Sequence, residues 1–326
     1  MVTYSRINRI VGVSTILFLL FLLIFSGCGW RNDKPSQPQG TPEDEFTFLF
    51  FSDTQADPAT GDYSAAGLLV ASAVAASTAG EHPPGLVIFG GDTVNDGGDP
   101  SEWQTFWQAF ALPLDNLKTA AVPGNHDHYP LLAGQFCYPQ SVPSATDDGY
   151  FYSFNMGQIH FTMLDSYIMG AARQEDIDWL RNDLESPAAS EAKWRIAVMH
   201  HPMWPPVNNP RDAARAETMR RYFLPVLEDF GVDLILCGHH HIYTRTLPMS
   251  GNQPQEPEES GRRAGIVQIM VASGDKVSYA IGDTDLFASN SLAPNYLMVT
   301  ATAETLYITA LNGDNEPIDA YIINTG

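Results

Sequence analysis

The segment Phe46-Thr47-Phe48-Leu49-Phe50-Phe51-Ser52-Asp53-Thr54-Gln55 sets a pattern that recurs along the chain. It begins with an almost unbroken apolar run, typical of a strand buried on both faces, and then delivers a carboxylate and an amide. Four later segments repeat this order of apolar run followed by polar side chains: Gly91-Asp92, Gly124-Asn125-His126-Asp127, His200-His201-Pro202 and Gly238-His239-His240-His241. Loops at strand ends are where α/β proteins build their sites. The sequence therefore predicts one polar site along a single edge of a folded sheet.

The first part of the chain alternates strands and helices, and the last part is rich in strands. The predicted strands cover residues 46–51, 86–89, 119–122, 150–154, 159–164, 194–199, 232–237, 266–272, 296–302, 306–311 and 318–323. The predicted helices cover residues 63–79, 101–117 with Ser101 as N-cap, 174–184 and 213–230. Residues 129–149 have the composition of an irregular functional loop. We expect an α/β fold in one domain over residues 46–326, with two stacked mixed β-sheets and helices outside, as a four-layer αββα sandwich.

The first 27 residues have the features of a secretory signal. Arg6 and Arg9 precede the apolar stretch 10–25, and Ser26-Gly27 lead into Cys28. This arrangement resembles a bacterial lipoprotein signal peptide that is cut before Cys28, whose thiol would then carry the lipid. Residues 28–45 are polar and rich in proline, as expected of a flexible tether. We expect an extracytoplasmic, membrane-anchored protein; the alternative is an uncleaved anchor, whose apolar core falls short of the roughly 20 residues that span a bilayer.

The charge and the cysteines restrict the partners and the redox chemistry. With 38 acidic and 17 basic residues, the net charge is −21 at pH 7, which disfavours nucleic acid because binding to phosphates needs clustered Lys and Arg. Cys137 and Cys237 could pair in an oxidising compartment, or remain buried thiols.

The polar segments carry oxygen and nitrogen donors and no thiolate. Such a set suits Mn²⁺, Fe, Zn²⁺ or Mg²⁺ better than copper or an iron–sulfur cluster. Alternate residues of an extended segment point the same way, so Asp53 and Gln55 can reach one ion, and His239 and His241 can point together while His240 points away. The candidate ligands outnumber the positions of one tetrahedral site, which indicates two ions: Asp53, Gln55, Asp92, Asn125, His200, His239 and His241.

In this order, Asp-x-Gln, Gly-Asp, Gly-Asn-His-Asp, a later His and Gly-His-x-His resemble the calcineurin-like metallophosphoesterases, and within them the purple acid phosphatase-like members. The resemblance covers roughly residues 46–323. It implies two metal sites that share Asp92, the first with Asp53, Gln55 and His241, the second with Asn125, His200 and His239. It also implies that a metal-bridging hydroxide attacks phosphorus, while His126 acts as general acid or as hydrogen-bond donor to the phosphoryl oxygens.

Some positions depart from the family or leave alternatives open. Gln55 stands where the family more often has His, which favours Mn²⁺ or Fe²⁺ at the first site. Asn95 stands where purple enzymes have a metal-ligating Tyr, so Fe³⁺–tyrosinate chemistry is not expected, and either Asn95 or Asp96 could pair with His126. We favour His200 over His201 as the ligand. Arg245 could orient the histidine loop or clamp a phosphate.

The sequence thus predicts a metal-dependent phosphoric ester hydrolase with catalytic Asp92 and His126. Its cofactors would be two divalent metal ions, Mn or Fe, with Zn or Mg as alternatives, and its partner a small phosphorylated substrate. Monoesters, diesters and nucleotide pyrophosphates stay open, as do the oligomeric state and the membrane that would hold the lipid. The alternative functions are a catalytically weak metal-binding surface module and a hydrolase of non-phosphorus esters.

Overall fold

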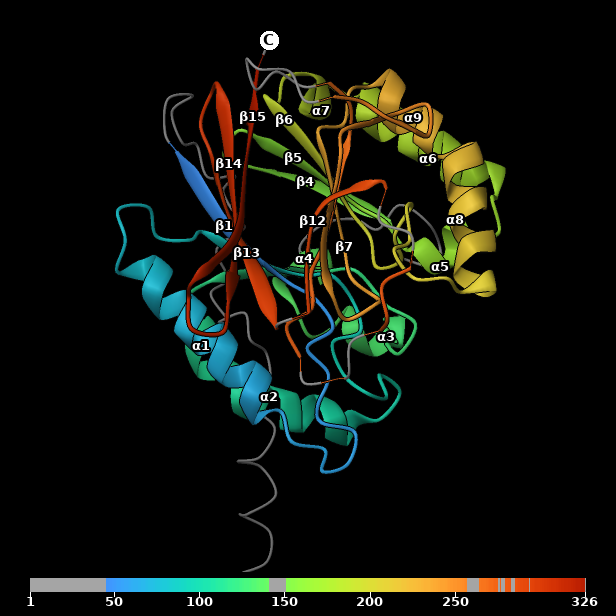
Figure 1. Ribbon diagram of the computed structural model, residues 1–326. Helices are drawn as coiled ribbons and strands as arrows, with labels where there is room; N and C mark the ends of the chain where they lie inside the picture. Colours follow the sequence, from blue (N-terminus) through green and yellow to red (C-terminus); the bar gives the residue numbers. More distant parts are fainter. Residues whose placement is uncertain are drawn as a thin grey trace, which may run out of the picture.

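Two mixed β-sheets lie face to face at the centre of the protein (Figure 1). The first sheet has six strands, in the order β15 (Pro317–Asn324), β14 (Thr305–Asn312), β13 (Asn295–Ala301), β1 (Phe46–Phe51), β2 (Leu86–Phe89) and β3 (Lys118–Ala121). The second has seven, in the order β12 (Phe287–Ser291), β8 (Tyr243–Thr246), β11 (Val267–Met270), β7 (Leu234–Cys237), β6 (Trp194–Val198), β5 (Ile159–Met163) and β4 (Tyr152–Met156). A small ribbon pairs β9 (Met249–Ser250) with β10 (Gln253–Pro254).

The strand directions bring many carboxyl ends to one edge. The strands β1, β2 and β3 run parallel to one another in the first sheet. In the second sheet β5, β6, β7 and β11 are also parallel. Because the carboxyl ends of parallel strands meet at the same edge, the loops that follow them share that edge.

Apolar side chains from the two sheets form the central core. Phe48 from β1 meets Phe161 from β5 edge to face, with ring centroids 5.2 Å apart, and both side chains are fully buried. Such pairs hold stacked sheets together because aromatic rings remove a large apolar area from water.

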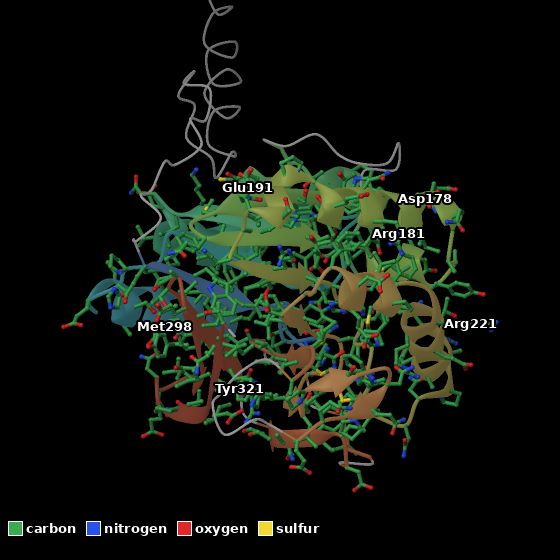
Figure 2. All side chains as sticks on the ribbon, turned by 90° about the horizontal axis from the view of Figure 1, so that it is seen from above. Asp178, Arg181, Glu191, Arg221, Met298 and Tyr321 are labelled. Carbon is green, nitrogen blue, oxygen red and sulfur yellow. The ribbon has the colours of Figure 1, made fainter. Side chains whose placement is uncertain are left out.

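Helices cover both outer faces of the sandwich. In the first half α1 (Ser64–Thr78) and α2 (Pro100–Leu114) pack on the first sheet, and the side chains of Phe106 and Phe110 stack against each other at 4.1 Å. The second sheet is covered by α6 (Gln174–Glu185), α8 (Pro210–Tyr222) and α9 (Leu224–Asp229). Figure 2 shows the charged side chains of Asp178, Arg181 and Arg221 on the outer side of this helical layer. The predicted four-layer α/β sandwich is therefore confirmed.

Several element boundaries differ from the prediction. The N-cap of α2 is Asp99 and not Ser101, because the Asp99 side chain accepts a hydrogen bond from the backbone N–H of Ser101 at 2.8 Å. The long helix predicted over residues 213–230 is two helices, α8 and α9. Its second part contains Pro225, which lacks an N–H and disfavours helical geometry in the residue before it. The predicted loop after residue 129 contains two short helices, α3 (Tyr129–Leu132) and α4 (Cys137–Gln140).

The structure describes residues 45–140, 151–256, 264–274, 276, 279–282, 285–292 and 294–325, and is a computed structural model. The predicted signal peptide, Cys28 and the tether up to residue 44 lie outside the described residues. Within the described part of the chain, no helix combines the length and the apolar character needed to cross a membrane. Cys137 and Cys237 are buried and are not joined in a disulfide, and the thiol of Cys237 lies 3.6 Å from the carbonyl of Ile269.

Candidate metal centre

The candidate ligands lie just beyond the carboxyl ends of five strands, from both sheets. We call this edge the rim and define it by the residues that follow the strands. They are Asp53 and Gln55 after β1, Asp92 after β2, Asn125 and His126 after β3, His200 after β6, and His239 and His241 after β7.

Aspartate and histidine side chains of the rim form small groups whose ligand atoms lie within 4.8 Å of one another. One group consists of Asp53, Asp92 and His241, and another of Asp92, His200 and His239. Asp92 therefore belongs to both groups, which is the geometry expected of a carboxylate placed between two cations. His200 Nε2 lies 3.3 Å from Asp92 Oδ2, so His200 rather than His201 is the histidine beside the shared carboxylate.

The backbone of the rim is strained at the residues that would hold the ions. Positive φ angles occur at Asp53 (53°), Asp92 (49°), His239 (84°) and His241 (52°). Left-handed backbone is costly for residues with a Cβ and persists only where the surrounding structure imposes it, as it often does at functional sites. These four conformations aim carboxylates and imidazoles into one place at a cost in stability.

Two glycines allow the loops of the rim to come close together. A Cβ on Gly124 would lie 2.2 Å from Asp92 Oδ1, and a Cβ on Gly238 would lie 2.2 Å from Asp53 Oδ2. Any side chain at either position would therefore displace a candidate ligand.

Buried polar atoms at the rim fit the binding of cations. Gln55 donates through Nε2 to the carbonyl of Val94 at 3.3 Å, while its buried Oε1 has no hydrogen-bond partner among the described residues. His200 Nδ1 lies 2.9 Å from the carbonyl oxygen of Gly90, which can only accept, so Nδ1 carries a proton and the buried Nε2, which faces Asp92, is the atom that could bind a metal ion. Buried polar atoms are otherwise almost always paired, so the unpaired Gln55 Oε1 is suited to binding a cation.

The electrostatics of the rim show how strongly its groups interact. Burial alone would raise the pKa of Asp92, but the charges of His200 and His126 hold it well below its usual range. Burial likewise disfavours the charged imidazole of His200, yet Asp92 raises the pKa of His200 to about 9. In the absence of metal ions His200 therefore holds its proton against Asp92, and a bound cation would displace that proton.

His126 stands at the exposed side of the rim. Its backbone N–H donates to Asp92 Oδ1 at 2.8 Å, and its Nδ1 lies 2.7 Å from the backbone carbonyl oxygen of Asn95. The partner of His126 is thus the Asn95 carbonyl rather than the side chain of Asn95 or Asp96, which answers a question that the sequence left open. Because a carbonyl only accepts, Nδ1 carries the proton and Nε2 is free to exchange protons with a substrate. The neighbouring Asn125 side chain is exposed.

The fourth residue of the Gly-Asn-His-Asp segment has a structural role. Asp127 accepts backbone hydrogen bonds from Gly124 at 2.9 Å and from Thr93 at 3.1 Å, which ties the loop after β3 to the loop after β2. Burial, followed by the charge of Asp92, raises the pKa of Asp127 to about 7.

Sequence reasoning missed Asp212 and two residues that follow β11. Asp212, from the first turn of α8, forms a third group with His201 and His239. The chain after β11 is bound to the rim by a hydrogen bond from Ser273 N to the Ser52 carbonyl at 2.8 Å. Farther along, the ring centroid of Tyr279 lies 5.4 Å from that of His241. The sequence offered no signal for Asp212, whose relation to the histidines arises only from the tertiary fold.

Besides Tyr279, the segment after β11 contains Lys276, which the sequence also did not indicate. It is half-buried and interacts electrostatically with Asp92, Asp53 and Glu102, and it forms no hydrogen bond or ion pair with the described residues. Burial lowers the pKa of Lys276, and the three carboxylates oppose that shift. Lys276 therefore places a positive charge within electrostatic range of two carboxylates of the rim, those of Asp92 and Asp53.

Arg245 lies away from the rim and does not orient the histidine loop through its side chain. Its guanidinium group pairs with Asp319 on β15, with Nε and Oδ2 separated by 2.7 Å. Both predicted roles of Arg245 are therefore wrong, because the side chain points between the sheets and braces β8 against β15.

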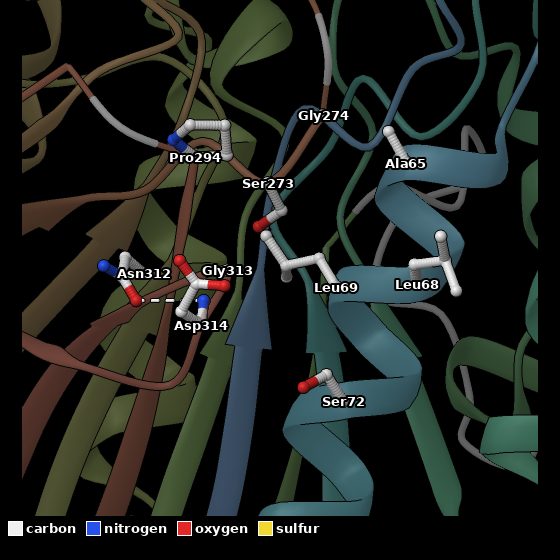
Figure 3. A pocket seen from close by; sticks show the side chains of 10 residues that line it. All are labelled: Ala65, Leu68, Leu69, Ser72, Ser273, Gly274, Pro294, Asn312, Gly313 and Asp314. Carbon is white, nitrogen blue, oxygen red and sulfur yellow. Dashed lines mark hydrogen bonds between the residues drawn. The ribbon is translucent and has the colours of Figure 1, made fainter.

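A hollow of about 570 Å³ lies beside α1 (Figure 3). Leu68 and Leu69 line it from the helix, and Ser273 and Gly274 line it from the segment after β11. None of the candidate metal ligands lines this hollow.

Comparisons with known proteins agree with this geometry. Residues 46–243 match the family described as Calcineurin-like phosphoesterase. The chain is 29% identical over 157 residues to "Purple acid phosphatase 15" and 26% identical over 232 residues to "Purple acid phosphatase 18", both from Arabidopsis thaliana. These matches cover 44% and 66% of this chain but only 29% and 51% of the two relatives, so the chain spans at most about half of their length.

Solved structures share the fold at low sequence identity. Purple acid phosphatase PPD1 from yellow lupin superposes with a TM-score of 0.69 at 16% identity, over 90% of this chain and 55% of that one. GAP50, described as the anchor in the inner membrane complex of Plasmodium, superposes with a TM-score of 0.61 at 16% identity, over 86% of this chain and 89% of that one. At such identities the likeness establishes the fold alone.

Proposed function

Because the chain belongs to the calcineurin-like phosphoesterase family, we propose that it hydrolyses phosphate esters with two divalent metal ions bound at the rim. The observation that carries this proposal is the position of Asp92, which belongs both to the group of Asp53 and His241 and to the group of His200 and His239. A carboxylate that is shared by two sets of ligands suits two neighbouring cations. Two independent metal sites would not need such a shared ligand.

The proposed ligands divide into two sets. Asp53, Gln55, Asp92 and His241 would hold one ion, and Asp92, Asn125, His200 and His239 the other. When bound, the two ions would activate a water molecule as the nucleophile and neutralise negative charge on the phosphoryl oxygens. Mn²⁺ or Fe²⁺ suits the amide oxygen of Gln55 best, with Zn²⁺ or Mg²⁺ as alternatives.

His126 would deliver a proton to the departing alkoxide. The hydrogen bond from Nδ1 to the Asn95 carbonyl fixes the ring and leaves Nε2 as the atom that exchanges protons. Its exposure at the edge of the site supports this role, because a leaving group has to be reached from the solvent side. Acid–base assistance of this kind is worth roughly 10²- to 10⁴-fold in rate.

The proposed substrate is a small phosphorylated molecule. Lys276 supports this class, because it adds a positive charge beside the carboxylates of the rim. The net charge of −21 argues against nucleic acid, which would be repelled by the rest of the surface. We also propose that the protein acts outside the cytoplasm, attached by a lipid at Cys28; the Arg6–Cys28 segment supports this location.

The substitution Asp92→Asn tests the proposal. Turnover of a chromogenic phosphate monoester by protein reconstituted with Mn²⁺ should fall by at least about 10³-fold, because the shared carboxylate contributes to both ion sites. Circular dichroism and the melting temperature check that the variant is folded. Turnover within a factor of three of the unsubstituted protein would rule the metal centre out as the catalytic site.

A panel of phosphomonoesters, phosphodiesters, nucleotide pyrophosphates and carboxylic esters then identifies the reaction. Greater activity on carboxylic esters than on phosphates would refute phosphoesterase function. Two bound ions with no turnover on the whole panel would instead favour a metal-binding surface module.

A further inference from the structure

Asp212 is placed at the rim by the start of α8. The Asn209 side chain caps this helix by accepting hydrogen bonds from the backbone N–H groups of Arg211 at 2.9 Å and Asp212 at 3.5 Å. Asp212 is buried, whereas its neighbours Arg211 and Ala213 are exposed. The first turn of α8 therefore directs one carboxylate inward, toward the loop after β7.

The two oxygens of Asp212 each meet a different histidine. Oδ1 lies 3.2 Å from His239 Nε2, and Oδ2 lies 3.1 Å from His240 Nε2. A carboxylate can only accept, so each imidazole presents an N–H to it. An imidazole protonated at Nε2 alone keeps its lone pair at Nδ1, and only a lone pair can bind a metal ion.

We propose that Asp212 is a positioning residue for the second metal ion. It fixes the ring and the tautomer of His239, so that Nδ1 is presented to the ion that this residue would share with Asp92 and His200. The inference rests on the proposed function, because it assigns to Asp212 an action on one of the two proposed ion sites. His241, which would hold the first ion, forms no hydrogen bond or ion pair with Asp212; its Nε2 lies 3.4 Å from Asp53 Oδ1.

A different reading would make His201, Asp212 and His239 the ligands of a third ion, since their ligand atoms also lie within 4.8 Å of one another. The surroundings of His201 argue against it. Ser166 Oγ accepts the backbone N–H of His201 at 2.8 Å and lies 2.9 Å from His201 Nδ1. Among the described residues the buried Ser166 hydroxyl has only Nδ1 to which it can donate, which leaves the proton of His201 on Nε2. A protonated Nε2 has no lone pair for a metal ion.

The test is a titration of the metal-free full chain with Mn²⁺ by isothermal calorimetry, for the unsubstituted protein and for Asp212→Asn. The unsubstituted protein should bind two ions. In Asp212→Asn the Kd of one ion should rise by roughly 10- to 100-fold, as is typical when the hydrogen-bond partner of a ligand histidine is removed, while the Kd of the other stays unchanged. Electron paramagnetic resonance at two equivalents of Mn²⁺ should then show a larger signal from isolated ions at the expense of the coupled pair.

Glu217→Gln is the matched control, because it removes one negative charge from an exposed position of the same helix. It should leave both Kd values unchanged. Asp212→Ser, which keeps a residue suited to a first helical turn, replaces Asp212→Asn if the latter does not fold.

The outcomes separate this inference from the proposed function. Selective weakening of one ion supports the positioning role. Equal weakening of both ions, or of neither, overturns it, and so does a stoichiometry of three ions that falls to two in Asp212→Asn. Failure of the unsubstituted protein to bind any Mn²⁺ would instead overturn the metal centre itself.

Discussion

The rim and the interface between the two sheets are both buried, yet they treat polar groups in opposite ways. Between the sheets, Asp319 on β15 accepts hydrogen bonds from Arg245 Nε at 2.7 Å, from Arg245 Nη2 at 3.1 Å and from the Tyr243 hydroxyl at 2.7 Å. At the rim, the buried Gln55 Oε1 has no hydrogen-bond partner among the described residues. Charged groups are paired in the first region, whereas a candidate ligand atom is left without a partner in the second.

The backbone shows the same difference. Near the other end of the sandwich, Trp194 Nε1 on β6 donates to the carbonyl of Thr302, just after β13, at 2.7 Å and joins the two sheets without left-handed backbone at either residue. At the rim, Asp53, Asp92, His239 and His241 have left-handed backbone. A fold tolerates unpaired atoms and strain where an ion or a substrate compensates for them, so their joint occurrence distinguishes a functional region from a structural one.

Among the substitutions that test this contrast between the rim and the sheet interface, His126→Ala is expected to have the largest effect, which is a loss of turnover. Removal of the proposed acid should lower kcat by roughly 10²- to 10⁴-fold while two ions remain bound, because His126 is not a proposed ligand. The measurement is steady-state hydrolysis of a phosphate monoester, together with the metal content of the purified protein. His82→Ala serves as control, since His82 is also exposed and pairs with Glu45 outside the rim. Unchanged kcat, or loss of an ion, would contradict the assigned role.

A smaller effect, on stability rather than on turnover, is expected for Asp319→Asn. The variant loses the charge partner of Arg245 in a partly buried pair, which should lower the free energy of unfolding by roughly 1–3 kcal/mol at pH 7. Burial opposes the charged form of Asp319, but the hydrogen bonds from Arg245 and Tyr243 lower its pKa overall. A lowered pKa stabilises the fold above the unfolded value of about 3.9, and this contribution is lost as the pH falls below it.

Urea denaturation at pH 7 and at pH 3 measures this effect. The difference between the unsubstituted protein and Asp319→Asn should shrink at the lower pH, while kcat at neutral pH should not change. A stability difference that is the same at both pH values would show that the charge of Asp319 does not stabilise the fold.

The smallest effect is expected for Lys276→Met. Loss of the ammonium group should raise KM for a phosphate monoester by about tenfold, equivalent to about 1.4 kcal/mol, and leave kcat within a factor of three. Lys276→Arg, which keeps the charge, should retain most of the affinity. A KM that does not respond to either substitution would remove Lys276 from the binding site.

The sequence predicted the elements whose signal is local. The apolar runs 46–51 and 86–89 gave the bounds of β1 and β2 to the residue, because no polar residue or proline interrupts them beyond the single Thr47. The gathering of the rim residues was also predictable, since each motif follows a strand and parallel strands end at a common edge. That the rim side chains bind metal ions stays a prediction.

The features that the sequence did not predict depend on contacts between distant parts of the chain. Asp212 meets His239 across 27 positions only because α8 packs beside the loop after β7. The strands β8 and β12 are short and contain polar residues such as Arg245 and Ser289, so no apolar run marks them. Arg245 looked like a site residue because it follows the histidines, but the direction of β8 carries it between the sheets.

The point at which the chain enters the fold has a consequence for orientation. Phe46 pairs with Ala301 at the amino end of β1, one full strand, or about 20 Å, from the loop that carries Asp53. The rim therefore lies at the end of the sandwich opposite to the start of β1.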